Sequence, residues 1–217
     1  VTSFNGQTRD YTYLVIKDEI RSKGNVELKT PAEIVSFAAT GTSIIKGDLV
    51  IGSDSDNAEE IKDISALGML KEIEGNIIIR NSYTGGTLTG LDNITKIGGL
   101  SIGSEENSAA NETLEMVSMT KLNEVTGNIH VYNNGVKFVQ FDLLKAIEGD
   151  FVISSSTLTT LQIPELINVG GALNIFGMGK GAISTLVFPK VQTVKNSLSI
   201  NEISTLKSIS FPELIET

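Results

Sequence analysis

Ile147-Glu148-Gly149-Asp150-Phe151-Val152-Ile153 is the clearest copy of a motif that recurs along this chain of 217 residues. The motif reads apolar, any residue, glycine, any residue, apolar, any residue, apolar. Its anchors are separated by 28, 23, 29, 22, 22 and 25 residues, and they are Gly47, Gly75, Gly98, Gly127, Gly149, Gly171 and Asn196. The copy at Gly98 is one residue short, and Asn196 replaces the glycine of the last copy. A repeat period in the twenties predicts a mainly β solenoid of about seven turns.

Each copy of the motif predicts a short strand. We expect the glycine to allow a tight turn into the strand, and the alternation that follows to bury the two apolar residues. These inward pairs are Leu49 and Ile51, Ile77 and Ile79, Ile129 and Val131, Phe151 and Ile153, Leu173 and Ile175, and Leu198 and Ile200. A second set of apolar residues, spaced three apart, predicts further inward positions in short 3₁₀ or extended turns, as in Phe138, Phe141, Leu144 and Ile147.

The chain before the first motif differs from the repeats. Residues 1–44 are expected to hold strands, at Tyr11–Ile16 and Asn25–Leu28, and a helix at Thr30–Ala39. Thr30 at the N-cap, Pro31 at the first helical position and Glu33 two residues later form a helix-start pattern. We expect this helix to cap the solenoid of residues 45–217, because an open end would expose apolar core and unpaired strand edges. The whole chain is expected to be one structural domain.

Two stretches carry a family resemblance. Gly75-Asn76-Ile77-Ile78-Ile79-Arg80-Asn81, with the Leu88 to Gly99 segment that follows, resembles the leucine-rich repeats of the receptor L-domain superfamily. More closely, the chain from residue 25 onward is similar to cell-surface proteins of Bacteroides-type gut bacteria. The resemblance implies a right-handed, leucine-rich-repeat-type superhelix. It also implies a secreted or outer-surface location with a lipid anchor, and a binding role.

Composition narrows the function classes. The net charge is −9 and no run of Lys or Arg occurs, so a nucleic acid partner is not expected. No apolar run approaches the roughly 20 residues that a membrane-spanning helix needs, so direct membrane insertion is not expected either. The chain has no Cys and one His, which leaves few ligands for a transition metal. We therefore expect no cofactor and no metal site, and a monomer.

Candidate chemistry is sparse. His130 lies between two inward positions and is expected at the surface, without a catalytic partner. The acidic loop Asp54–Glu59 has the oxygen density that Ca²⁺ prefers, but it lacks the glycine and spacing of a calcium loop and reads as a solvated loop. A carbohydrate-active β-helix enzyme would need paired acids on one strand face. The predicted outward positions bring no such pair together.

The outward positions instead predict a binding stripe. Arg80, His130, Tyr132 and Phe176 fall on outward positions of three turns, beside Ile78 and Val152. Arginine and aromatic side chains on a regular sheet are typical of protein hot spots and of sugar-stacking surfaces. Outward β-branched residues are also ordinary in strands, so the stripe is a hypothesis.

We expect a non-enzymatic, cell-surface binding or adhesion module for a protein or glycan ligand on a host or neighbouring cell. A structural spacer domain within a larger surface protein is the alternative, and a carbohydrate-active enzyme is a third. Insertions follow the first strand of each repeat, so their loops should project from one edge, which is a second place for a binding site.

Overall fold

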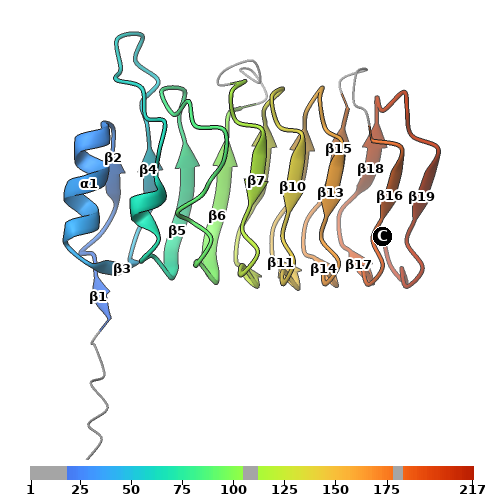
Figure 1. Cartoon of the computed structure of the whole chain (residues 1–217). Coiled ribbons are helices and arrows are strands. Elements are labelled where there is room, and N and C mark those ends of the chain that lie inside the picture. The colour runs from blue at the N-terminus through green and yellow to red at the C-terminus, as the bar shows by residue number, and fades with distance from the viewer. Residues whose placement is uncertain (1–18, 105–111, 178–182) are drawn as a thin grey trace, which may run out of the picture.

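The chain folds into a parallel β-solenoid of about eight turns with one α-helix near its N-terminal end (Figure 1). The computed structural model describes residues 19–104, 112–177 and 183–217. The strand expected at Tyr11–Ile16 lies outside these residues. The strands stack side by side along the solenoid axis, so most backbone hydrogen bonds join one turn to the next.

Each turn contributes strands to ladders that run the length of the solenoid. The first ladder consists of β2 (Val26–Leu28), β4 (Leu49–Ile51), β5 (Glu72–Ile79), β6 (Lys96–Ile102), β9 (Ile129–Tyr132), β12 (Phe151–Ser154), β15 (Leu173–Phe176) and β18 (Leu198–Asn201). The second consists of β1 (Ile20–Arg21), β3 (Thr42–Ile45), β5, β6, β8 (Glu124–Val125), β11 (Ala146–Ile147), β14 (Asn168–Val169) and β17 (Thr193–Val194). Because β5 and β6 run through both ladders, these strands form one sheet of 14.

The third ladder is shorter and is interrupted. Its strands are β7 (Met116–Ser118), β10 (Phe138–Gln140) and β13 (Thr160–Gln162), followed by β16 (Thr185–Val187) and β19 (Ser208–Ser210). The first three form one sheet and the last two form another.

The turn that the sequence motif did not count is the one that contains β2. Val26, Glu27 and Leu28 pair in register with Leu49, Val50 and Ile51 of β4. Gly24 and Asn25 stand just before Val26, as Gly47 and Asp48 stand before Leu49 in the next turn. The sequence motif missed this turn because Ser22 stands where the motif has an apolar residue. The Ser22 hydroxyl accepts a hydrogen bond from the Lys46 N–H at 3.0 Å, so a polar contact replaces the apolar one.

The predicted helix is confirmed, and so is Thr30 as the N-cap residue of that helix. Helix α1 spans Pro31–Ala39, and Thr30 is its N-cap. The Thr30 hydroxyl accepts from the Glu33 N–H at 3.2 Å, and the Glu33 carboxylate accepts from the Thr30 N–H at 3.1 Å, which completes a capping box. Ile34 is buried, whereas Val35 is 66% exposed. The helix contacts β2 on the first turn; its role as a cap stays a prediction.

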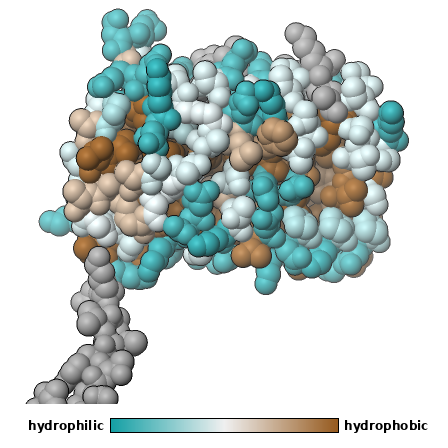
Figure 2. Space-filling model, viewed as in Figure 1, coloured by the Kyte–Doolittle hydropathy of each residue, from teal (hydrophilic) through white to brown (hydrophobic). Residues whose placement is uncertain are grey.

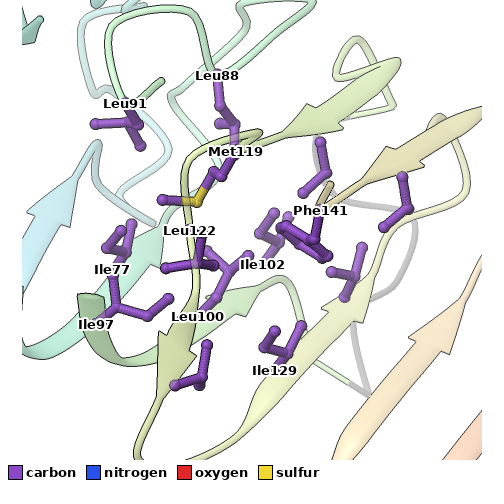
Figure 3. Packing of buried hydrophobic residues seen from close by; sticks show 14 of the residues in the cluster. Ile77, Leu88, Leu91, Ile97, Leu100, Ile102, Met119, Leu122, Ile129 and Phe141 are labelled. Carbon is purple, nitrogen blue, oxygen red and sulfur yellow. The ribbon is translucent and has the colours of Figure 1, made fainter. Parts of the chain in front are cut away.

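The core is a continuous column of mostly aliphatic side chains inside the turns, with a few aromatic residues such as Phe141 among them (Figure 3). The inward pairs predicted for β4, β5, β9, β12 and β15 are all buried. Leu198 and Ile200 of β18 are only partly buried, because no described turn covers them on the far side. Figure 2 shows a mostly polar outer surface on the side that it draws, with apolar side chains over α1 and over β16.

The prediction that Phe138 points inward was wrong. Phe138 is 39% exposed, and its neighbour Val139 is fully buried in its place. The register explains the error, since Phe138 pairs with Met116 and Thr160, which lie on outward positions of β7 and β13. The short 3₁₀ turn expected from the three-residue spacing occurs as η1 (Ser65–Leu67), and the next turn has the same type of bond from the Leu91 N–H to the Leu88 carbonyl. The three turns after that have the strands β7, β10 and β13 in this part.

The glycine column marks the place where consecutive turns approach most closely. The sequence explained these glycines by a tight turn, but none of the column has a positive φ. A Cβ at Gly149 would lie 2.0 Å from Oδ1 of Asn128 and 2.8 Å from the backbone of Gly127. A Cβ at Gly171 would similarly lie 2.1 Å from Oδ1 of Asp150. The glycines are therefore required by the backbone and side chain of the preceding turn.

An Asn or Asp after a glycine supplies the oxygen that fills this space in several turns. The Asn25 Oδ1 accepts from the Asp48 N–H at 3.0 Å, and the Asp48 Oδ1 accepts from the Asn76 N–H at 2.7 Å. The same contact joins Asn128 to Asp150 at 2.8 Å and Asp150 to Ala172 at 2.7 Å. Ala172 has no side-chain oxygen to extend toward the next turn, and that turn is the one with Asn196 in the glycine column.

We predict that Gly149→Ala lowers the free energy of unfolding by about 3 kcal/mol, because its methyl group overlaps Asn128 and the Gly127 backbone. Gly127→Ala is the matched control. Its Cβ meets only the Gly98 carbonyl closely, at 2.8 Å, and we expect a loss of about 1 kcal/mol. In an Asn128→Ala background, the cost of Gly149→Ala should fall. Urea unfolding measures all four variants, and equal losses at both glycines would contradict the explanation.

Candidate binding face

The candidate stripe lies on outward positions of the first ladder, and the strand register aligns it across turns. One column contains Ile78, Ser101, His130, Val152, Asn174 and Ser199, each paired with the next. A second column pairs Tyr132, Ser154, Phe176 and Asn201 in the same way. The predicted columns are therefore confirmed in these strands, and parallel pairing holds their side chains about 4.8 Å apart from turn to turn.

Two of the four predicted residues are in contact, and the other two lie two turns away on either side of them. The rings of His130 and Tyr132 make an edge-to-face contact, with centroids 6.0 Å apart at an interplanar angle of 64°. Phe176 is two turns further along the column of Tyr132, so the two rings flank Ser154. Val152 and Ser154 are each only 6% exposed although they point outward, so neighbouring side chains cover them. The contacting rings of His130 and Tyr132, with Phe176 two turns further along the sheet, make this part of the face aromatic.

Arg80 lies two turns from Tyr132, on the side opposite Phe176, because Ile79 pairs with Ile102 and Ile102 pairs with Val131. Its guanidinium pairs with Asp54 at 2.6 Å, and the other carboxylate oxygen of Asp54 accepts from the Asn81 N–H at 3.1 Å. Both side chains of the ion pair are 44% exposed, and such a pair contributes only about 0.2–1 kcal/mol. A ligand can therefore recruit Arg80 at little cost. Asp54 belongs to the acidic loop Asp54–Glu59 that the sequence analysis considered for Ca²⁺. Its carboxylate pairs with Arg80 and does not cluster with Asp56 and Glu59.

A polar hollow separates Arg80 from the rings. It has a volume of about 320 Å³ and is lined by Asp54, Ile78, Ile79, Arg80, Asn81, Ser101, Gly103 and Ser104. Strand β6 lies between β5 and β9, and its outward positions are Ser101 and, just after the strand, Gly103. These residues are smaller than the outward residues of β5 and β9, so a hollow remains between them. The candidate face therefore has a charged, hydrogen-bonding half and an aromatic half.

Asn174 adds an unsatisfied acceptor to this face, which the sequence did not indicate. Its Oδ1 is buried and has no hydrogen-bond partner among the residues that the structure describes. Asn174 pairs with Val152 on one side and Ser199 on the other. A buried acceptor without a partner costs about 1–3 kcal/mol.

The loop edge is a second candidate, and part of it is packed. Figure 1 shows the loops that follow β4 and β5 at the edge toward which the arrows point. In the second of these loops Tyr83 is buried, and its hydroxyl donates to the Thr87 carbonyl. Burial raises the pKa of Tyr83 above its usual range, and the nearby Asp63 carboxylate adds to that effect. The loops at 105–111 and 178–182 lie outside the described residues.

The side chains and helices of the described part of the chain bear on metal binding and membrane insertion. There, no group of three or more His, Cys, Asp or Glu side chains is placed to hold a metal ion. Nor does this part contain a helix long and apolar enough to cross a membrane.

Comparisons with models of protein families, with curated proteins and with solved structures found no match. The geometry alone therefore defines the class of protein, which is a parallel β-solenoid with an aliphatic core and one aromatic strand face.

We predict that Asn174→Leu raises the free energy of unfolding by about 1 kcal/mol, because it replaces an unsatisfied buried acceptor with a side chain of similar shape. Asn201→Leu, on the exposed end of β18, is the control and should change stability by less than about 0.5 kcal/mol. Thermal and urea unfolding measure both. A loss of stability in Asn174→Leu would show that the amide is satisfied in solution.

Proposed function

We propose that this protein is a non-enzymatic binding or adhesion module whose outward face on the first ladder recognises a protein or glycan ligand. The observation that carries the proposal is the placement along one regular sheet of the contacting rings of His130 and Tyr132, with Phe176 two turns to one side and the polar hollow beside Arg80 on the other. Aromatic faces supply stacking area at a small cost in conformational entropy, and the Arg80–Asp54 pair supplies donors and acceptors.

The same proposal includes the finer fold type and the location. We propose a right-handed, leucine-rich-repeat-type solenoid with α1 as its N-terminal cap, acting as a monomer at the outer surface of a cell through a lipid anchor. Support comes from the repeat motif and from the burial of Ile34 against the first turns. The net charge of −9 agrees with a protein or glycan partner and disfavours nucleic acid.

We predict that a His130→Ala, Tyr132→Ala, Phe176→Ala variant binds at least tenfold more weakly than the wild type, because stacked aromatic anchors dominate such contacts. The measurement is binding of the purified protein to arrays of host glycans and extracellular-matrix proteins. Phe138→Ala is the matched control, since Phe138 is an exposed aromatic residue on the third ladder. Arg80→Ala, measured separately, reports on the polar half of the face.

The result distinguishes the candidate sites. Saturable binding that the triple variant loses while its circular dichroism spectrum stays unchanged would support the strand face. Saturable binding that the triple variant retains would instead place the site at the loop edge. Asn174→Leu is a further test of the strand face. If Asn174 takes part in binding, this variant should bind the ligand more weakly although its free energy of unfolding is higher.

A second candidate is a structural spacer within a larger surface protein. It is favoured by the regular repetition of short strands, which continues through β19 in the last described turn. Phe211 of this turn stacks on Phe188 with ring centroids 4.4 Å apart, so the side-chain ladder is still regular there. Absence of binding to every array ligand would favour this candidate.

A further inference from the structure

The third ladder is interrupted between β13 and β16, although the two other ladders are continuous at the same turns. Where the third ladder is intact, the Phe141 N–H donates to the Gln162 carbonyl at 2.9 Å, and the Phe188 N–H donates to the Ser210 carbonyl at 2.9 Å. The equivalent bond from Ile163 to Val187 is absent. In the same pair of turns β14 pairs with β17 and β15 pairs with β18. The gap is therefore confined to one face.

A groove occupies this gap. Its volume is about 520 Å³, and it is lined by Asp142, Thr159, Thr160, Leu161, Gln162, Ile163, Pro164, Ile183, Thr185, Val187 and Pro189. Val187 on one wall is 48% exposed, and Figure 2 shows apolar side chains over β16. Just past the two prolines, Lys190 of one turn pairs with Glu165 of the other at 2.6 Å. That ion pair joins the two turns beyond the groove.

Both walls of the groove present backbone groups that have no backbone partner among residues 19–104, 112–177 and 183–217. In β13, the backbone N–H and C=O groups of Thr160 and Gln162 point toward β10. The N–H and C=O of Leu161 and the N–H of Ile163 therefore face the groove. In β16, Leu186 bonds toward β19, so Thr185 and Val187 direct their N–H and C=O groups at β13. No backbone hydrogen bond joins the two walls in the part of the chain that the structure describes. Two facing strand edges of this kind are complementary to an extended backbone.

We propose that the groove between β13 and β16 binds an extended peptide segment of a partner protein, which inserts as an additional strand and bonds to both edges. Recognition comes first from the backbone, as in other cases of strand addition. The groove lies on the third ladder and the aromatic face lies on the first, so this site is independent of the proposed function.

The walls also define the side chains that the peptide carries. The peptide residue that lies beside the buried Leu186 points toward the core, so we expect it to be apolar and β-branched. The peptide residues before and after it point outward, beside Thr160 and Thr185. Asp142 lies on the rim of the groove, and the protein has a net charge of −9. A Lys or Arg in the peptide therefore complements the site and accelerates association.

The test begins with the free protein. Amide hydrogen exchange followed by NMR should show fast exchange at Leu161, Ile163, Thr185 and Val187, and slow exchange at Phe141 and Phe188, whose N–H groups are bonded. Slow exchange at the first four amides without any added peptide would overturn the proposal. Protection that grows with protein concentration alone would also overturn it, in favour of a second copy of this chain as the occupant.

The probe is a fluorescein-labelled synthetic peptide with the sequence of residues 137–141, Lys-Phe-Val-Gln-Phe, because β10 is the strand that β13 already accepts on its other edge. We expect saturable binding by fluorescence polarisation and slowed exchange at the four groove amides. The matched control is the same peptide with methylated backbone nitrogens at its second and fourth residues, which keeps the side chains and removes donors. It should bind at least about tenfold more weakly.

A protein variant tests the same edge. Val187→Pro removes an N–H that has no partner in the free protein, and it should weaken peptide binding severalfold. Ile209→Pro, on β19 at the far side of the same two-stranded sheet, is the control and should bind normally. If Val187→Pro fails to fold, the methylated peptide still decides the question. No binding, equal binding of both peptides, or binding without protection of the four amides would each overturn the proposal.

Discussion

The close approach of consecutive turns at the glycine column is the constraint on which the rest of this solenoid depends. At Gly149 the space that a side chain would need is filled by the Asn128 amide and by the backbone of Gly127. The Asn128 oxygen in turn accepts from the Asp150 N–H, so the contact that excludes a side chain also joins the turns. Where the column is intact, the strands that follow start in register and their side chains stack.

This constraint acts on the first and second ladders and has little influence on the third. The glycines stand between the second ladder and the first, and both stay paired to the last described turns. The strands of the third ladder follow loops of different lengths. Whether two of these strands pair therefore depends on where the preceding loop places each strand. Between Gly171 and Asn196 the repeat is 25 residues long, against 22 for the two repeats before it, and there the third ladder separates. A regular face and an interrupted face thus coexist on one solenoid.

The candidate sites differ in how far the sequence predicted them. The column of Tyr132 and Phe176 followed from counting residues after each glycine, because strand alternation is local. The ion pair of Arg80 with Asp54 did not follow, since it joins side chains 26 residues apart across a turn boundary. Phe138 was placed wrongly because a three-residue spacing fits two registers, and only pairing with β7 and β13 chooses between them. The groove between β13 and β16 is invisible in the sequence, because it consists of a pairing that fails to form.

The sequence by itself determined the repeat, the strands of the first ladder, the inward aliphatic pairs and the capped helix at Pro31–Ala39. These features depend on residues close together in the chain, whose periodicity and capping chemistry can be read directly. The tertiary structure alone decided that β2 adds a turn, that the glycines are needed for close approach, that Asn174 has an unpaired oxygen, and that the third ladder is open at one point. Each of these depends on contacts between turns, where residues more than 20 positions apart meet.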